Sequence, residues 1–158
     1  MAGLKQTFVT KLTDVNSTAQ EVLGSLRFEN NKVYKYVEIK NTTATVSGVA
    51  GDCVAYFAAT GYGNNRVVLD LSDADATVAF AAGILCGTIT GTLAVSEYGW
   101  IQIKGAATLS IAVTSGAAGK TFKLTTVDKT ATVGTAATDN VMGISANATT
   151  GVCLDCPF

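Results

Sequence analysis

The side chains best able to do covalent or metal chemistry are four cysteines, because the chain contains no histidine. Without histidine, the Ser-His-Asp and Cys-His catalytic arrangements and the histidine metal sites are excluded. Cys153 and Cys156 form one C-x-x-C pair, whereas Cys53 and Cys86 stand alone. A structural zinc site takes four cysteine or histidine ligands, usually in two close pairs. We therefore expect free thiols that act as small apolar side chains, with a disulfide between the C-x-x-C cysteines as the open alternative after oxidation.

Carboxylates gather in one place, at Asp70, Asp73 and Asp75. Their spacing does not match the EF-hand loop, and the glycine that such a loop needs is missing, so aspartates that close turns are the simpler interpretation. The Gly119-Lys120-Thr121 sequence lacks the earlier glycine of a phosphate-binding loop at the right spacing, and a strand rather than a helix is expected after it. We expect no catalytic residue, no metal and no cofactor, and hence no enzyme.

The composition is rich in small apolar residues and poor in charge. Hydrophobic residues make up 48% of the 158 residues, charged residues make up 15%, and the formal net charge is −1. Charged residues average about 25% in soluble domains, so much of this surface is expected to be covered by partners. The near-zero charge argues against nucleic-acid binding. No apolar run approaches the roughly 20 residues of a membrane-spanning helix, and no secretion signal follows Met1, so we expect no membrane partner and synthesis in a cytoplasm.

Residues 1–25 differ from the rest of the chain and are predicted to form an extended N-terminal arm. Their apolar residues are spaced among lysines and threonines, and the only glycines lie near the two ends of the segment. A capping box at Ser17 and Gln20, or at Thr18 and Glu21, predicts one short helical turn that ends at Gly24. Arms of this kind often lie on a neighbouring subunit. A first edge strand of the chain's own sheet is the alternative.

From residue 26 onward, short strands alternate with tight turns, which predicts one all-β domain over residues 26–158. Residues 33–39 alternate well, with Val33, Lys35, Val37 and Ile39 on one face and the tyrosines on the other. Further strands are predicted at residues 53–58, 67–71, 77–81, 88–95, 100–104, 108–113, 121–125, 141–145 and 152–154. Short strands at close spacing, with turn residues between them, are typical of a β-sandwich or β-barrel.

An internal repeat divides this domain into pseudo-repeats at about residues 26–95 and 96–158. Residues 34–41 (YKYVEIKN) match residues 98–105 (YGWIQIKG), and residues 47–51 (SGVAG) match residues 115–119 (SGAAG). A third block, Gly-Ile followed by Thr-Gly, occurs once in each half, and the three blocks keep their order. This self-similarity predicts two similar β-modules that pack together to complete one core. Val37, Ile39, Ile101 and Ile103 are expected to point into that core.

Several stretches resemble the capsid decoration (cement) proteins of tailed bacteriophages. The resemblance covers most of residues 23–155 and lies in Leu23 to Arg27 followed by Val33 to Val37, in Ala50-Gly51-Asp52, in residues 98–105, and in Val141 to Ser145 followed by Thr150 to Leu154. The cysteines and the C-x-x-C tail depart from the pattern. The resemblance implies a β-barrel or β-tulip-like homotrimer on the outside of a capsid in the virion. There it would bind the major capsid protein and bridge neighbouring capsid subunits.

Eight residues are expected to contact the capsid or a neighbouring subunit. In the arm, Phe8 and Leu12 would be apolar anchors, with Lys5 and Lys11 as charge partners. On the outer face of the two matched strands, the aromatic candidates are Tyr34, Tyr36, Tyr98 and Trp100. Deleting residues 2–15 is expected to abolish capsid binding while leaving the fold intact.

Another class of protein shares this β-rich, Thr- and Gly-rich composition. A tail or fibre adhesin, or a receptor-binding β-module, would have a similar fold. Such proteins normally carry several exposed aromatic side chains on which sugar rings stack, whereas this chain has a single tryptophan. The decoration function is therefore favoured, and the adhesin function is kept as the alternative.

Overall fold

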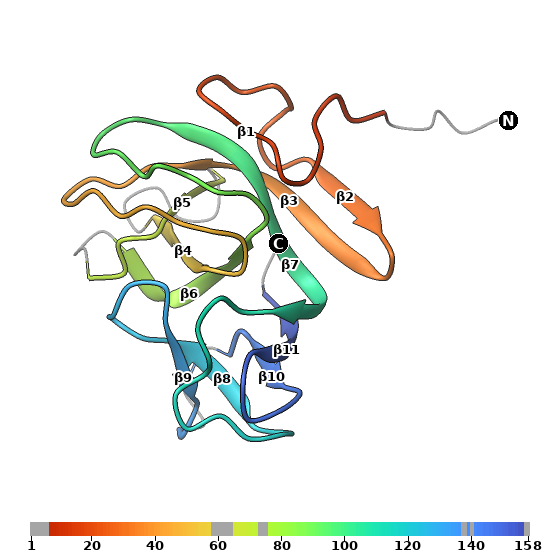
Figure 1. Ribbon diagram of the computed structural model, residues 1–158, viewed down its shortest axis with the longest axis vertical. Coiled ribbons are helices and arrows are strands. Elements are labelled where there is room, and N and C mark those ends of the chain that lie inside the picture. Colours follow the sequence, from red (N-terminus) through yellow and green to blue (C-terminus); the bar gives the residue numbers. More distant parts are fainter. Residues whose placement is uncertain (1–6, 58–64, 73–75, 137–138, 140, 157–158) are drawn as a thin grey trace, which may run out of the picture.

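The computed structural model describes residues 7–57, 65–72, 76–136, 139 and 141–156. Within these ranges the regular secondary structure is entirely β, as predicted, and no helix is present that could cross a membrane. In this described part of the chain, eleven strands form one mixed sheet (Figure 1). The strands are β1 (Val15–Asn16), β2 (Leu26–Glu29), β3 (Lys32–Ile39), β4 (Cys53–Phe57), β5 (Arg66–Val68), β6 (Ala76–Leu85), β7 (Glu97–Thr108), β8 (Thr121–Leu124), β9 (Ala131–Val133), β10 (Gly143–Ser145) and β11 (Gly151–Asp155).

The strands pair in the order β2-β3-β5-β4-β6-β7-β11-β10-β8-β9, and β7 also pairs back with β3. Consequently β3, β5, β4, β6 and β7 hydrogen-bond in a closed ring. Among the described strands only β3 and β5 run parallel, and β1 pairs with β7 outside the main path. Figure 1 shows the ring strands above and β8 to β11 below, with the long strand β7 joining the two groups.

A single large hydrophobic core runs from β3 to β11. Val37, Ile39, Ile101 and Ile103 all belong to it, which confirms the faces assigned from the alternation. Lys35 lies on the same face and is buried; its Nζ donates a hydrogen bond of 2.9 Å to the Tyr56 hydroxyl and lies 5.0 Å from the centre of that ring. Burial lowers the pKa of the Lys35 ammonium, because the core disfavours its charge.

Residues at matching positions of the two pseudo-repeats take part in similar strand pairings. The matched strands β3 and β7 lie side by side, with Tyr36 directly opposite its counterpart Trp100. On β4 and β6, Val54 pairs with Gly83, and at the matching positions on β8 and β10, Phe122 pairs with Gly143.

The turns before β4 and β8 are equivalent as well. The amide of Asp52 donates to the Val49 carbonyl, and the amide of Lys120 donates to the Ala117 carbonyl, both at 3.1 Å. In each turn the third residue is a glycine with positive φ, a conformation that other residues adopt only with strain. The two SG-x-AG blocks therefore form the same turn, and each turn leads into a strand of the sheet.

Several local expectations were wrong. Residues 17–24 form bends and a turn rather than a helical turn: the Ser25 amide donates to the Val22 carbonyl, with Gly24 at positive φ. Residues 88–95 form no strand and contribute one isolated bridge, between Ile89 and Gly48. Residues 109–113 are likewise irregular, whereas the short strand β9 was not predicted.

Candidate interaction surface

The outer face of β3 and β7 carries a cluster of aromatic side chains. Tyr34, Tyr36 and Trp100 are buried there and form a second hydrophobic cluster, apart from the main core. The rings of Tyr36 and Trp100 meet edge to face, with centroids 5.2 Å apart. Alternation along paired strands explains the cluster, because residues that lie opposite each other project to the same face.

The N-terminal segment, residues 7–23, covers this aromatic cluster. Phe8 packs edge-on against Trp100, with ring centroids 5.1 Å apart and planes at 87°, and Leu12 and Leu23 also contact the cluster. The Trp100 indole N–H donates a 2.9 Å hydrogen bond to the Thr10 hydroxyl. The Tyr36 hydroxyl accepts a 3.1 Å hydrogen bond from a backbone amide of the same segment. The segment therefore lies on the chain's own sheet.

Two charged side chains hold the segment in this position. One carboxylate oxygen of Glu21 accepts hydrogen bonds from the amides of Val9 and Thr10 and from the Thr10 hydroxyl, at 2.7 to 3.0 Å. Arg27 donates to the Thr10 carbonyl at 3.1 Å, and its guanidinium carbon lies 5.5 Å from the centre of the Phe8 ring. Hydrogen bonds to charged groups are stronger than those between neutral groups, so Glu21 and Arg27 restrain the position of the N-terminal segment.

The structure brings most of the predicted contact residues together. Tyr36 and Trp100 are fully buried, Tyr34 is nearly so, and Phe8, Leu12 and Tyr98 pack against them. Lys11 is exposed, and Lys5 lies outside the described residues. Sequence reasoning missed Thr10, Glu21 and Arg27, which fasten the segment. The sparse charge of the chain was the one available signal for Glu21 and Arg27.

Exposed apolar side chains occur along the described chain, and the most exposed of them lie in its N-terminal part. Of the large apolar side chains that the structure describes, the three most exposed are Val9 at 83%, Val22 at 79% and Phe28 at 71%. Val9 and Phe28 line the same hollow, of about 700 Å³, between residues 7–12 and residues 27–29. Exposed apolar side chains that lie close together, as Val9 and Phe28 do here, are typical of sites that contact other molecules.

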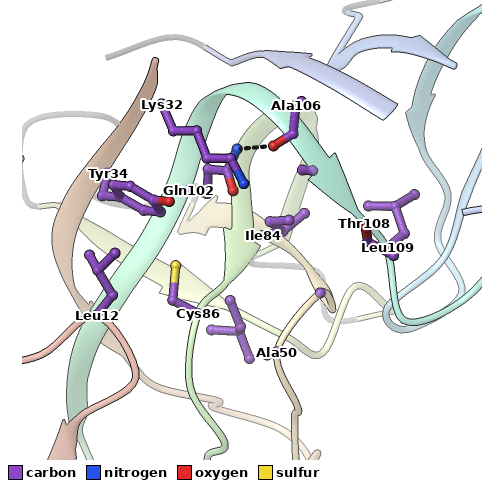
Figure 2. Close-up of a pocket in the computed structure, with 13 residues that line it drawn as sticks. Leu12, Lys32, Tyr34, Ala50, Ile84, Cys86, Gln102, Ala106, Thr108 and Leu109 are labelled. Atoms are coloured by element: carbon purple, nitrogen blue, oxygen red, sulfur yellow. Dashed lines mark hydrogen bonds between the residues drawn. The ribbon is translucent and has the colours of Figure 1, made fainter. Parts of the chain in front are cut away.

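A second hollow, of about 650 Å³, lies where the segment meets β3, β6 and β7 (Figure 2). Its walls include Leu12, Tyr34, Ile84 and Cys86, and the Gln102 side-chain amide beside it is held by three backbone carbonyls of β7. Burial raises the pKa of the Cys86 thiol to about 12, so the thiol stays protonated and is a poor nucleophile near neutral pH. The hollow is lined mostly by apolar side chains, with Lys32, Gln102 and Thr108 as its polar members.

The four cysteines are free thiols in three environments, and Cys86 is the partly buried one, beside the aromatic cluster. Cys53 and Cys156 are buried in the core, as expected for small apolar side chains, while Cys153 is exposed. Cys153 and Cys156 therefore face opposite sides of the sheet, which does not suit a disulfide between them. Burial raises the pKa of the Cys156 thiol to about 12 and raises that of Cys53 as well.

Asp70 is the member of the aspartate cluster that the structure describes, and its carboxylate stabilises a turn. Asp70 accepts hydrogen bonds from the hydroxyls of Thr43 and Ser72, at 2.8 and 2.7 Å. Asp73 and Asp75 lie outside the described residues. In the described part of the chain, no group of three or more cysteine, aspartate or glutamate side chains is arranged to hold a metal ion.

Comparison with known proteins finds no relative of this chain. No protein-family model, curated protein or solved structure matches the chain. The function is therefore inferred from the residues themselves and from the surface that they form.

Proposed function

We propose that this chain is a structural, non-enzymatic virion protein that binds the outer surface of a tailed-phage capsid and cements neighbouring major capsid subunits. Its resemblance to decoration proteins over residues 23–155 suggests the class. The all-β architecture fits that class. Its partners would be the major capsid protein and further copies of itself in a homotrimer.

The observation that carries the proposal is the exposure of two apolar side chains of the N-terminal segment, Val9 and Val22. A decoration protein must bury apolar area at many equivalent sites, and each buried Å² contributes about 25 cal/mol before the costs of association. The surface also has a rigid base, because Glu21 and Arg27 fix the segment that carries Val9. A preorganised surface loses less entropy on binding.

We infer further that the closed ring of β3, β5, β4, β6 and β7 forms a small β-barrel. The equivalent turns and pairings around β4 and β8 favour an origin in two similar β-modules. The shared core would then be the result of packing the second module against the first. A rigid body of this kind is suited to bridging capsid subunits.

The adhesin alternative is weaker, because sugar recognition relies on exposed tryptophan or tyrosine rings, whereas the most exposed aromatic side chain among the described residues is Phe28. Sugar recognition uses the faces of tryptophan and tyrosine as stacking platforms. Here the only tryptophan is 1% exposed, and the N-terminal segment packs on it. Tyr36 is fully buried in the same cluster.

The proposal is tested by co-sedimentation of the purified chain with capsids that lack it. We expect saturable binding that falls at least about tenfold in a Val9→Ser, Val22→Ser double variant. Val127→Ser is the matched control, because Val127 is also an exposed valine but lies between β8 and β9. Absence of binding by the native chain, or equal binding by all three proteins, would contradict the proposal.

Point variants are better suited to this test than the deletion of residues 2–15. Phe8 and Leu12 cover Trp100, and Thr10 accepts the hydrogen bond of its indole. Removing them would expose the aromatic cluster, so a loss of binding by the deletion variant would also reflect a loss of stability.

A further inference from the structure

β2 leaves one edge of the sheet open. It stands at the end of the pairing order and, among the described strands, pairs only with β3. Figure 1 shows it at the margin of the molecule. The other end of the order is covered: Thr114 accepts a hydrogen bond from the Val133 amide, and its own amide donates to the Ala131 carbonyl on β9. An open strand edge can pair with a strand of another chain.

The hydrogen-bonding groups on this edge can be assigned from the hairpin. Asn30 and Asn31 both have positive φ, as in the two-residue turn that joins closely paired strands. The Tyr36 amide donates to the Ser25 carbonyl, so bonding toward β3 alternates along β2. The backbone N–H and C=O groups of Leu26 and Phe28 consequently point away from β3.

The side chains of β2 divide between its two faces. Leu26 packs against the main core, and Phe28, on the same face, is 71% exposed. Arg27 and Glu29 lie on the other face, where their side chains form an ion pair of 3.0 Å. The edge thus carries one exposed aromatic ring, one anion and one cation in a row. The cation, Arg27, is 23% exposed and also bonds the Thr10 carbonyl of its own chain.

This pattern is self-complementary in one antiparallel register. If two copies of β2 pair with Phe28 opposite Phe28 of the second copy, the outward backbone groups of the two strands meet. Arg27 then lies opposite Glu29 of the second copy, and the two phenylalanines meet at the two-fold axis. The neighbouring allowed register, with Leu26 opposite Phe28, places Arg27 opposite Arg27. Like charges directly opposite each other are destabilising.

We propose that β2 is a two-fold pairing site for a second copy of this chain. The hollow of about 700 Å³ between residues 7–12 and 27–29 lies beside the edge, so the N-terminal segment leaves space there. A homotrimer would need a different interface, because a three-fold axis does not superpose the same edge on itself. The pairing at β2 therefore joins chains two by two, and joins trimers into hexamers if trimers form. It holds without any capsid.

The test is a charge-complementation experiment on the full chain, read by sedimentation equilibrium. Arg27→Glu places two glutamates opposite each other, and Glu29→Arg places two arginines opposite each other. Each variant alone is expected to self-associate at least about tenfold more weakly than the native chain. Because Arg27→Glu also removes the bond to the Thr10 carbonyl, the deciding results are the loss in Glu29→Arg and the recovery in the mixture. In an equal mixture, both cross-strand pairs become opposite charges again, and association returns to near the native strength. Lys120→Glu, a charge change at an exposed residue outside β2, is the control and should leave association unchanged.

A second variant addresses the backbone. Phe28→Pro removes an N–H that points away from β3, so the hairpin keeps its own hydrogen bonds while the pairing edge loses a donor. We expect Phe28→Pro to stay folded and to lose association. A native chain that is only monomeric or only trimeric would overturn the proposal. So would undiminished even-numbered association of Glu29→Arg and Phe28→Pro, or a mixture that fails to associate although both partners are folded. Capsid binding is measured separately, so failure here leaves the decoration function standing.

Discussion

Thr10 joins three parts of the molecule through one hydroxyl and two backbone groups. The hydroxyl accepts from the Trp100 indole and donates to Glu21, while the Thr10 carbonyl accepts from Arg27. The residue is buried, and its bond from the Trp100 indole is shielded from water. A buried donor that loses its partner costs more than a surface hydrogen bond contributes.

Thr10→Val keeps the shape of the side chain and removes the hydroxyl. We expect a loss of about 1–3 kcal/mol in the free energy of unfolding, because the Trp100 N–H is left buried without an acceptor. Urea unfolding followed by Trp100 fluorescence measures the change. Thr7→Val, at an exposed position of the same segment, is the control. Equal stabilities of the two variants would show that the Thr10 bonds do not hold the segment.

The buried thiols make stability depend on alkaline pH. Burial raises the pKa of Cys156 from the ordinary thiol value of 9.0 to about 12. Between these values the unfolded chain loses the proton and the folded chain keeps it, so stability is full below pH 9.0 and falls as pH rises toward about 12. The free energy of unfolding, measured by urea titration, should fall less between pH 8 and about 11 in Cys156→Ala than in the native chain. Each protein's value at pH 7 is its own reference. An unchanged slope would contradict the assignment.

At the scale of elements, the close approach of β10 and β11 depends on Gly143. A Cβ at this position would overlap the carbonyl oxygen of Cys153, just as one at Gly83 would overlap the Gln102 carbonyl of β7. The φ angle of Gly143 is not positive, so an alanine there would cause no backbone strain. The steric overlap with Cys153 alone therefore determines how much stability the substitution costs.

Gly143→Ala is therefore expected to cost about 1–3 kcal/mol of stability through overpacking. Gly134→Ala is the matched control: its Cβ would meet only side-chain atoms at 3.2 Å or more, and a change within about 0.5 kcal/mol is expected. Thermal unfolding of the three proteins by circular dichroism provides the comparison. A neutral Gly143→Ala would mean that β10 and β11 can separate without loss.

Local patterns predicted some elements well and others poorly, for physical reasons. Residues 33–39 alternate because their strand separates two hydrophobic clusters, so the period of two reveals both faces. The residues of 88–95 show a similar β-forming composition, but Gly87 and Gly91 lie against the backbone of Thr13 and Val46. These contacts come from distant parts of the chain, which no local pattern contains.

The candidate surface was only partly predictable for the same reason. The aromatic residues of β3 and β7 could be named from the matched strands. That the N-terminal segment folds back onto them depends on contacts such as the hydrogen bond from Trp100 to Thr10, which lie far apart in sequence. The exposed positions Val9, Val22 and Phe28 have no signature of their own, because an apolar residue alone does not reveal whether it is covered.

For the molecule as a whole, the shared core predicts cooperative unfolding. The core contains residues of both pseudo-repeats, from Val37 to Leu154, so neither half buries its apolar face alone. Trp100 fluorescence and far-ultraviolet circular dichroism should therefore give coincident unfolding curves. Gly143→Ala, in the second half, should shift both curves equally. Trp100 and Gly143 both belong to the second pseudo-repeat. A shift of the fluorescence curve with a smaller shift of the circular dichroism curve would therefore mean that the halves unfold independently.

The decoration function itself is tested most directly by the abundance of this chain in purified phage particles. Quantitative mass spectrometry against the major capsid protein gives the ratio of the two chains. A capsid-wide cement predicts a copy number comparable to that of the major capsid protein. A few copies per particle would place the chain in the tail or a fibre, and its absence from the particle would contradict the proposed function.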